Sequence, residues 1–206
     1  MADDLRRLIA DLLATHGPPL TVALDGPSGA GKSTLARALA AALPATVVLS
    51  DDFFAAQLTR ADWDSRNPME RARDAIDWMR LRREAIEPLV AGRRATWHPF
   101  DFIAGERPDG TYAMAAHVEQ CEPAPIILVD GAYSSRPELA DLLDLTVLVD
   151  TPEEVRRARL IAREDAVFLA RWHERWDAAE SYYFGRVRPA ESFDVVVDST
   201  GVVCKH

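Results

Sequence analysis

The sequence predicts an α/β fold in which a five-stranded parallel sheet is flanked by helices. Short apolar runs rich in β-branched residues recur along the chain, helical patterns separate them, and several runs end at an aspartate. Because these runs are continuously apolar rather than alternating, we expect strands that helices bury on both faces. The five expected strands are residues 20–24, 46–49, 126–129, 145–149 and 193–197.

The first 50 residues are predicted to form a helix, a strand, a second helix and a second strand. The first helix is amphipathic, and its apolar positions are Leu5, Leu8, Ile9, Leu12 and Leu13. Gly17-Pro18-Pro19 ends it before strand 20–24. After a glycine-rich turn, residues 32–43 are dense in Ala and Leu, which favours a helix, and Pro44 ends that helix before strand 46–49.

The rest of the chain alternates helical patterns with strands, apart from one segment. Helices are expected at about 70–91, 136–143, 152–164 and 166–184. Residues 92–122 instead carry aromatic runs around a Pro108-Asp109-Gly110 turn, which predicts a small β-hairpin insertion over the sheet. We therefore expect a single domain over residues 1–206, a length that is sufficient to bury one sizeable core.

Composition and charge exclude several function classes. The chain has 24 Lys and Arg against 33 Asp and Glu, a net charge of −9, so we expect no nucleic-acid binding. Charged residues interrupt the opening sequence MADDLRRLIADLL, and no apolar run approaches the ~20 residues of a membrane span, so neither export nor a membrane is expected. Cys121 and Cys204 fit no disulfide or zinc framework, which favours the cytoplasm. A homo-oligomer is left open.

The strongest functional signal is a phosphate-binding loop between the first strand and the second helix. It matches G-x-x-x-x-G-K-[ST] and comprises Gly26, Pro27, Ser28, Gly29, Ala30, Gly31, Lys32 and Ser33, followed by Thr34. In such a loop, backbone N–H groups face the phosphates of a nucleotide, Lys32 would approach the β and γ phosphates, and Ser33 would ligate Mg²⁺. A glycine-rich turn that binds nothing is the alternative, but chance matches in this context are rare.

Aspartates at strand ends are candidates for the chemistry. Phosphoryl transfer to an alcohol needs a carboxylate near the acceptor hydroxyl and oxygen ligands for Mg²⁺. Asp130 follows four apolar residues and precedes Gly131, so it is the expected magnesium ligand, with an ordinary Asp-Gly turn as the alternative. Asp150 precedes a helix start and is expected to be structural. Asp51 and Asp52 are neighbours on an extended chain, so we expect only one of them to face the nucleotide.

Residues 156–188 are expected to form a mobile, arginine-rich helical lid. This segment holds eight arginines against five acids. Arg156, Arg159 and Arg163 share one helical face, where guanidinium groups can clamp a transferring phosphoryl group, and we assign this role to Arg159 and Arg163. A solvated helix face is the alternative, which is preferred for Arg157. The segment also carries an aromatic stripe, formed by Trp172, Trp176, Tyr182 and Tyr183.

These residues together resemble the uridine kinase-like branch of the nucleoside-monophosphate-kinase-type phosphate-loop kinases. The resemblance runs, with gaps, from about residue 20 to 198. Besides the phosphate loop, it is carried by Leu49-Ser50-Asp51-Asp52-Phe53-Phe54, Pro99-Phe100-Asp101-Phe102, Val129-Asp130-Gly131-Ala132-Tyr133, Val149-Asp150-Thr151 and Phe193-Asp194-Val195-Val196-Val197-Asp198. It implies the P-loop NTPase fold with a helical lid, and ATP and Mg²⁺ as the nucleotide and the metal.

The resemblance also implies roles for single residues. Asp52 would activate the acceptor hydroxyl, and Asp130 would lie near Mg²⁺. The expected acceptor pocket consists of Asp52, Phe53, Asp77, Trp97, His98, Phe100 and Asp101. For Asp77, Trp97 and His98 the alternatives are a helix-surface acid, a packed aromatic and a loop histidine. The sequence departs from the family at the acceptor pocket and the lid: no His follows Phe102, Phe100 replaces a Tyr, and an Arg-Gly pair after residue 165 is missing.

We therefore predict an ATP- and Mg²⁺-dependent kinase that transfers the γ-phosphoryl group to a hydroxyl of a small molecule. The acceptor would be nucleoside-like, or another sugar, vitamin or natural-product alcohol. Two alternatives remain. One is a nucleotide-dependent switch or ATPase that acts on a protein partner, and the other is a nucleoside monophosphate kinase, in which Arg66, Arg71 and Arg73 would face the acceptor phosphate.

Overall fold

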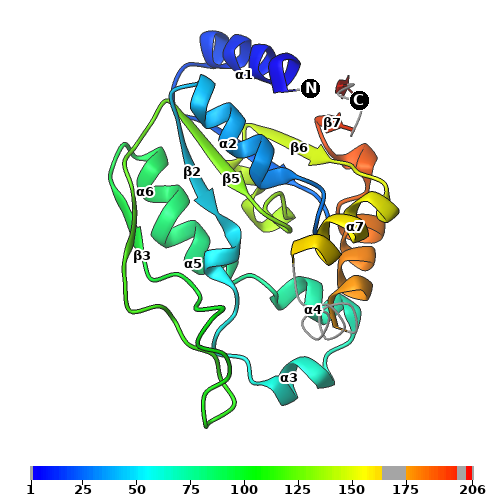
Figure 1. Cartoon of the computed structure of the whole chain (residues 1–206). Helices are drawn as coiled ribbons and strands as arrows, with labels where there is room; N and C mark the ends of the chain where they lie inside the picture. The colour runs from blue at the N-terminus through cyan, green and yellow to red at the C-terminus, as the bar shows by residue number, and fades with distance from the viewer. Residues whose placement is uncertain (1, 164–174, 199–202, 206) are drawn as a thin grey trace.

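The computed structural model describes residues 2–163, 175–198 and 203–205 of the chain. Its centre is a sheet with the strand order β2-β5-β1-β6-β7-β8 (Figure 1). Five strands are parallel, namely β1 (Leu20–Asp25), β2 (Ala45–Leu49), β5 (Ile126–Asp130), β6 (Leu145–Val149) and β7 (Val195–Val197). The expected five-stranded parallel sheet is thus confirmed. A sixth strand, β8 (Val203–Lys205), pairs antiparallel with β7 in a tail whose pattern predicted no element.

The strand register brings three strand ends to one edge of the sheet. Asp130 at the end of β5 lies beside Leu24 of β1 on one side and beside Leu49 of β2 on the other. The segments that follow these strands therefore start side by side, at the edge where open α/β sheets bind ligands. This places the phosphate loop, the two neighbouring aspartates and Asp130 at a common edge.

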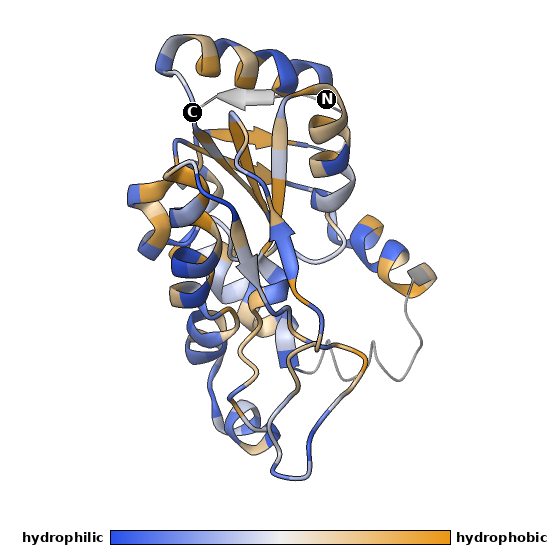
Figure 2. Ribbon diagram, turned by 90° about the vertical axis from the view of Figure 1, so that its left-hand side faces the viewer, coloured by the Kyte–Doolittle hydropathy of each residue, from blue (hydrophilic) through white to orange (hydrophobic). Residues whose placement is uncertain are grey.

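Helices cover both faces of the sheet, as its continuously apolar strands predict. On one face, α1 (Ala2–His16) and α2 (Lys32–Ala42) pack against β1 and β5, with Leu5, Ile9 and Leu39 fully or almost fully buried. Along β5 the side chains alternate between two hydrophobic clusters, because successive residues of a strand face opposite ways. Figure 2 shows the resulting apolar interior between polar outer surfaces.

On the other face the helices are shorter than the predicted pattern at 70–91. This region contains α3 (Arg60–Ser65), α4 (Pro68–Asp74), and α5 (Trp78–Arg80), which continues through a π-helical stretch (Leu81–Ile86) into α6 (Glu87–Val90). Capping boxes start the first two helices: Thr59 pairs with Asp62, and Asn67 pairs with Glu70. The side chain of Asp77 caps α5. These polar caps divide the region into separate helices.

The later elements follow the expected order. Short 3₁₀ helices occupy Ser50–Phe53, Pro137–Leu142 and Ala190–Ser192, and α7 spans Glu153–Arg163. Of the helix expected at 166–184, residues 175–182 are helical and continue into a π-helical stretch, Tyr183–Val187, while residues 164–174 lie outside the described ranges. Trp172 of the aromatic stripe falls in that gap.

The insertion forms a hairpin, as predicted. Strands β3 (Ala95–Trp97) and β4 (Glu119–Cys121) pair antiparallel, and isolated bridges join Phe100 to Met114 and Glu106 to Tyr112 farther along (Figure 1). The thiol of Cys121 donates to the Val47 carbonyl of β2 over 3.3 Å, which holds the hairpin against the sheet edge. Among the described residues, no helix combines the length and apolarity needed to cross a membrane.

Candidate active site at the phosphate loop

The phosphate loop joins β1 to α2, and two of its glycines are required by close packing. Gly26 and Gly29 both have positive φ values. A Cβ on Gly26 would lie 2.5 Å from the Val149 carbonyl oxygen, and one on Gly29 would lie 2.8 Å from the Arg156 carbonyl oxygen. Any side chain at these positions would therefore displace β6 or α7. The loop has the backbone form that the motif predicts.

Lys32 opens α2 and folds back over the loop. Its side chain is almost buried, and its Nζ donates to the carbonyl oxygens of Gly26 at 2.7 Å and Pro27 at 3.1 Å. Thr34 lies in the first turn of the same helix and donates its backbone N–H to Gly31. The ammonium group thus lies at the mouth of the loop, where it satisfies backbone oxygens.

Asp25, which sequence reasoning missed, anchors the base of the loop. Its fully buried carboxylate accepts hydrogen bonds from the backbone N–H of Gly26 (2.8 Å), Tyr133 (2.9 Å) and Ser135 (3.0 Å). It also accepts from the hydroxyls of Ser135 (2.6 Å) and Tyr183 (2.9 Å). Burial, with Asp25 adding to the effect, holds the pKa of Tyr183 well above its ordinary value. One carboxylate therefore connects the loop, the turn after β5 and the segment after residue 175.

Asp130 and Ser33 have the chemistry of a magnesium site. Asp130 is 2% exposed, its Oδ1 has no hydrogen-bond partner, and burial raises its pKa against the opposing effects of the Ser33 hydroxyl and the Lys32 charge. A buried oxygen without a partner beside a hydroxyl fits a cation that prefers oxygen ligands. Within the described ranges, no group of three or more His, Cys, Asp or Glu side chains could hold a metal. Further ligands would have to come from a substrate or water.

Asp51 and Asp52 face different parts of the molecule, as expected for neighbouring residues. It is Asp51, and not Asp52, that faces the cavity beside the loop. The 3₁₀ turn Ser50–Phe53 directs Asp51 into a cavity of about 80 Å³ that Lys32 also lines. The Oδ2 of Asp52 instead accepts a hydrogen bond from the indole N–H of Trp97 at 2.8 Å. Burial raises the pKa of Asp52, while the bond from Trp97 opposes that shift. The Asp52 carboxylate thus contacts the insertion, whereas Asp51 lines the cavity at the loop, and the catalytic role of Asp52 stays a prediction.

An aromatic cavity of about 750 Å³ adjoins this small cavity. Its aromatic lining consists of Phe54, Trp63, Phe100, Phe102, Tyr112 and Trp176, and the rings of Phe54, Phe102 and Trp176 line both cavities. Neighbouring rings pack with centroids 4.6 to 6.1 Å apart. Four separate segments thus build a contiguous aromatic wall that leads away from Lys32 and Asp51.

Two of the seven residues expected in the acceptor pocket lie in this cavity, and five, including Asp52, do not. Phe100 and Asp101 line it, although the Asp101 carboxylate also accepts from two backbone N–H groups of its own loop. Phe53 is fully buried in the core, 5.3 Å from the Trp97 ring. The remaining two serve local structure: Asp77 caps α5, and His98 contacts the Ala115 carbonyl beside a separate cavity.

The arginines of α7 contact the backbone of the loop. Arg156 donates to the Ser28 carbonyl at 3.1 Å, and Arg159 donates to the carbonyls of Gly29 and Ala30 at 3.1 and 3.0 Å. Arg156 and Arg159, which share a face of α7, thus both lie against the loop. Arg163 ends α7, but its side chain lies outside what the structure describes. The transfer roles of Arg159 and Arg163 stay predictions.

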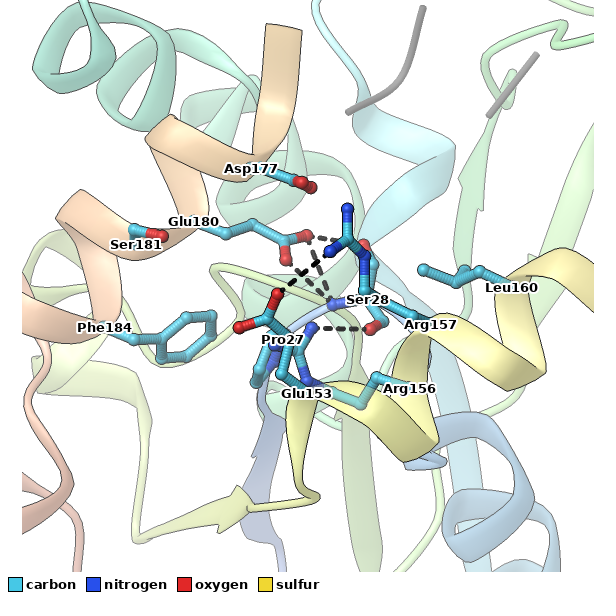
Figure 3. Close-up of a pocket in the computed structure, with 10 residues that line it drawn as sticks. All are labelled: Pro27, Ser28, Glu153, Arg156, Arg157, Leu160, Asp177, Glu180, Ser181 and Phe184. Atoms are coloured by element: carbon cyan, nitrogen blue, oxygen red, sulfur yellow. Dashed lines mark hydrogen bonds and ion pairs between the residues drawn. The ribbon is translucent and has the colours of Figure 1, made fainter. Parts of the chain in front are cut away.

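Glu180 is a second functional candidate that the sequence did not reveal. It lies on the helix at 175–182 and is 7% exposed. Its carboxylate accepts from the backbone N–H of Ser28 at 3.1 and 3.2 Å and from the Ser28 hydroxyl at 2.5 Å (Figure 3). Burial raises its pKa, while Ser28 and the charges of Lys32 and Arg156 lower it. The sequence offered only a helical acid among arginines, so no pattern indicated this contact.

Comparison with known sequences agrees with this geometry. A family model described as an AAA domain matches residues 22–184. The uridine kinase of Streptococcus gordonii is 25% identical over 174 residues, which cover 83% of this chain and 78% of that protein. The uridine kinase of Leuconostoc citreum is 28% identical over 160 residues, which cover 71% of this chain and 69% of that protein.

Solved structures share the fold. A Bacillus stearothermophilus protein described as a possible uridine kinase superposes with a TM-score of 0.61 at 21% identity, over 94% of this chain and 98% of that one. A protein from Silicibacter sp. TM1040, described as a fructose transport system kinase, superposes with a TM-score of 0.64 at 24% identity, over 91% and 95% of the two chains. The overall fold therefore recurs in these structures.

Proposed function

Because the chain belongs to the AAA domain family and has the fold of the phosphate-loop kinases, we propose that it is an ATP- and Mg²⁺-dependent kinase acting on a small-molecule alcohol. The γ-phosphoryl group would move from the phosphate loop to a hydroxyl of an acceptor in the aromatic cavity. The observation that carries this proposal is the small cavity that Lys32 and Asp51 both line, which we call the connecting cavity. It borders the loop and shares the rings of Phe54, Phe102 and Trp176 with the aromatic cavity. Its residues would thus face both substrates.

Asp51 is the proposed general base. A base must lie within hydrogen-bond reach of the proton it removes, and the acceptor hydroxyl has to sit between the base and the phosphate. Asp51 lines the connecting cavity, whereas Asp52 is engaged by Trp97 on the other side. Asp52 then acts as a positioning residue that fixes the turn Ser50–Phe53 against the insertion.

Ser33 and Asp130 are the proposed magnesium ligands, together with phosphate oxygens of the nucleotide. The metal, when bound, would offset negative charge on the phosphates during transfer. The chain's own groups would bind the phosphates directly. Loop N–H groups would hold phosphate oxygens, and Lys32 would turn from the carbonyls of Gly26 and Pro27 toward the nucleotide. Arg159, which lies at the Gly29 carbonyl, would contact the transferring phosphoryl group.

The acceptor side favours a bulky alcohol with a planar or apolar body. Six of the thirteen residues that line the cavity are aromatic, and rings stack on a nucleobase as readily as on other flat groups. Six of the others are charged, namely Arg60, Asp64, Arg71, Asp101, Glu106 and Arg175. A nucleoside monophosphate as acceptor is less well supported, because the arginines considered for its phosphate have internal partners. Arg66 and Arg73 pair with Asp74, and Arg71 donates to backbone carbonyls of Trp63 and Arg175. We place the enzyme in the cytoplasm, where ATP is available.

An ADP-coupled assay with a panel of nucleosides, sugars, vitamins and hydroxyl-bearing natural products tests this function. We expect ADP release that depends on one class of alcohol. With that alcohol, Asp51→Asn should lower turnover by about 100-fold or more, because a positioned base contributes that much. Asp52→Asn is the matched control, and its turnover should fall less than about tenfold. Equal loss in both variants would remove the assignment of the base, and ADP release without any acceptor would favour an ATPase that acts on a partner.

A further inference from the structure

The carboxylate of Glu180 lies where the phosphate loop would bind an anion. It accepts hydrogen bonds from the hydroxyl and the backbone N–H of Ser28, and this N–H belongs to the loop that the motif provides for phosphate. Figure 3 shows the side chain extending from its helix across to Ser28 between Asp177 and Arg156. Glu180 lines both the connecting cavity, with Lys32 and Asp51, and a second cavity of about 160 Å³ beside α7. An anion of the protein itself therefore occupies the mouth of the loop.

Other cationic groups at the loop also form hydrogen bonds within the protein. Lys32 donates to two loop carbonyls, and Arg159 donates to two more. In this conformation the Ser28 N–H, the Lys32 ammonium and the Arg159 guanidinium are all engaged by groups of the chain. A loop N–H can serve only one strong acceptor, and two negative groups that share one site repel each other.

We propose that Glu180 is an internal ligand of the phosphate loop, which the phosphates of the nucleotide have to displace. This inference rests on the proposed function, since it concerns binding of ATP to the same loop. Glu180 would lower the affinity of the free protein for ATP, and it would hold the loop in its binding form when no nucleotide is present.

Displacement of Glu180 would also reach the acceptor cavity. Trp176 lies one turn earlier on the same helix, and its ring packs 5.2 Å from Phe54 and 5.0 Å from Trp63 in the aromatic wall. Tyr183, three residues later, stays bound to Asp25 below the loop. A helix that is fixed at Tyr183 and released at Glu180 moves most at the Trp176 end, so nucleotide binding would change the acceptor wall.

Calorimetric titration with MgATP, and separately with inorganic triphosphate, tests the proposal without any acceptor. Glu180→Gln keeps the size of the side chain but removes its charge. Because charge-assisted hydrogen bonds are worth about tenfold or more in an equilibrium constant, both probes should bind about tenfold more tightly to this variant. Asp177→Asn is the matched control, because it removes one charge from an exposed carboxylate of the same cavity; its affinities should change less than about twofold.

A second variant covers the case in which Glu180→Gln does not fold. Ser28→Ala removes the hydroxyl that donates to Glu180 but keeps the backbone N–H for phosphate, so triphosphate should again bind severalfold more tightly. Unchanged or weaker binding to the variants, with ATP still binding to the unaltered protein, would overturn the role of Glu180 alone. Absence of binding in every protein would overturn this inference and the proposed function together.

Discussion

The loop end and the acceptor end of the cleft are stabilised by different kinds of contact. At the loop end, the buried carboxylate of Asp25 accepts five hydrogen bonds from backbone N–H and hydroxyl groups. At the acceptor end, aromatic rings from separate segments pack on one another. Hydrogen bonds fix direction, whereas ring packing is less directional. The difference suggests that phosphate binding is fixed by backbone geometry, while a few ring substitutions could change the acceptor.

Loss of Lys32 should produce the largest effect at the loop end. In Lys32→Ala the transferring phosphoryl group loses its nearest point charge, so turnover should fall by about a thousandfold. The fold should remain, because Lys32 lines the cavity and its hydrogen bonds go to two carbonyls of the loop itself. ADP release and the circular dichroism melting curve measure the two outcomes. A variant that keeps ATP-dependent turnover would show that the loop does not serve transfer.

Asp25→Asn should mainly affect stability. The NH₂ group of the asparagine would face the N–H and hydroxyl groups that donate to Asp25, and the negative charge would be lost. The free energy of unfolding should therefore fall by roughly 3 kcal/mol, as expected for a buried charged acceptor. Asp194→Asn is the control, because Asp194 is exposed and accepts from the N–H and hydroxyl of Thr146; its loss should cost less than about 1 kcal/mol. Urea denaturation compares them, and equal costs would contradict the anchoring role of Asp25.

A ring removed from the acceptor end should change acceptor binding alone. The Phe102 ring is 55% exposed and packs 4.6 Å from Phe100, so Phe102→Ala should raise the KM of the acceptor by about tenfold. The KM of ATP should not change. Ile103→Ala is the control, since this neighbouring side chain is 97% exposed and should leave both KM values unaltered. A higher KM for ATP in Phe102→Ala would show that the two ends are not separate.

The smallest effect expected is a pH dependence of stability from Glu180, whose pKa burial raises above the ordinary 4.5. The unfolded chain releases this proton first as pH rises, so the stabilising contribution of protonated Glu180 is complete below 4.5 and is lost as pH passes the folded pKa. The melting temperature should therefore fall with rising pH relative to Glu180→Gln. The charges that face Glu180, namely Lys32, Arg156, Arg157, Glu153, Asp177 and Asp51, are identical in both proteins. A constant difference across pH would contradict the raised pKa.

The parallel sheet and the phosphate loop were predictable because their signals are local. Continuous apolar runs identify buried strands, and the loop needs glycine where a Cβ would collide with Val149 or Arg156. Helix α3 and the start of α4 were missed, although Thr59 with Asp62, and Asn67 with Glu70, form capping boxes that a closer search would find.

The acceptor cavity and the contacts of Asp52 were not predictable, because they depend on packing between distant segments. Which of two neighbouring aspartates faces the loop is decided by Trp97, some 45 residues away along the chain. Asp25 and Glu180 likewise acquire their roles from partners more than 100 residues distant. Local pattern contains no information on such contacts, and for this reason we propose Asp51 as the base although the resemblance implied Asp52.

The most direct test of the kinase assignment is ³¹P nuclear magnetic resonance of a reaction mixture that contains the protein, MgATP and the alcohol that accelerates ADP release. Transfer to a hydroxyl predicts a phosphomonoester signal that grows in step with ADP and is absent with Asp51→Asn. Growth of inorganic phosphate alone, with every alcohol tested, would contradict the account.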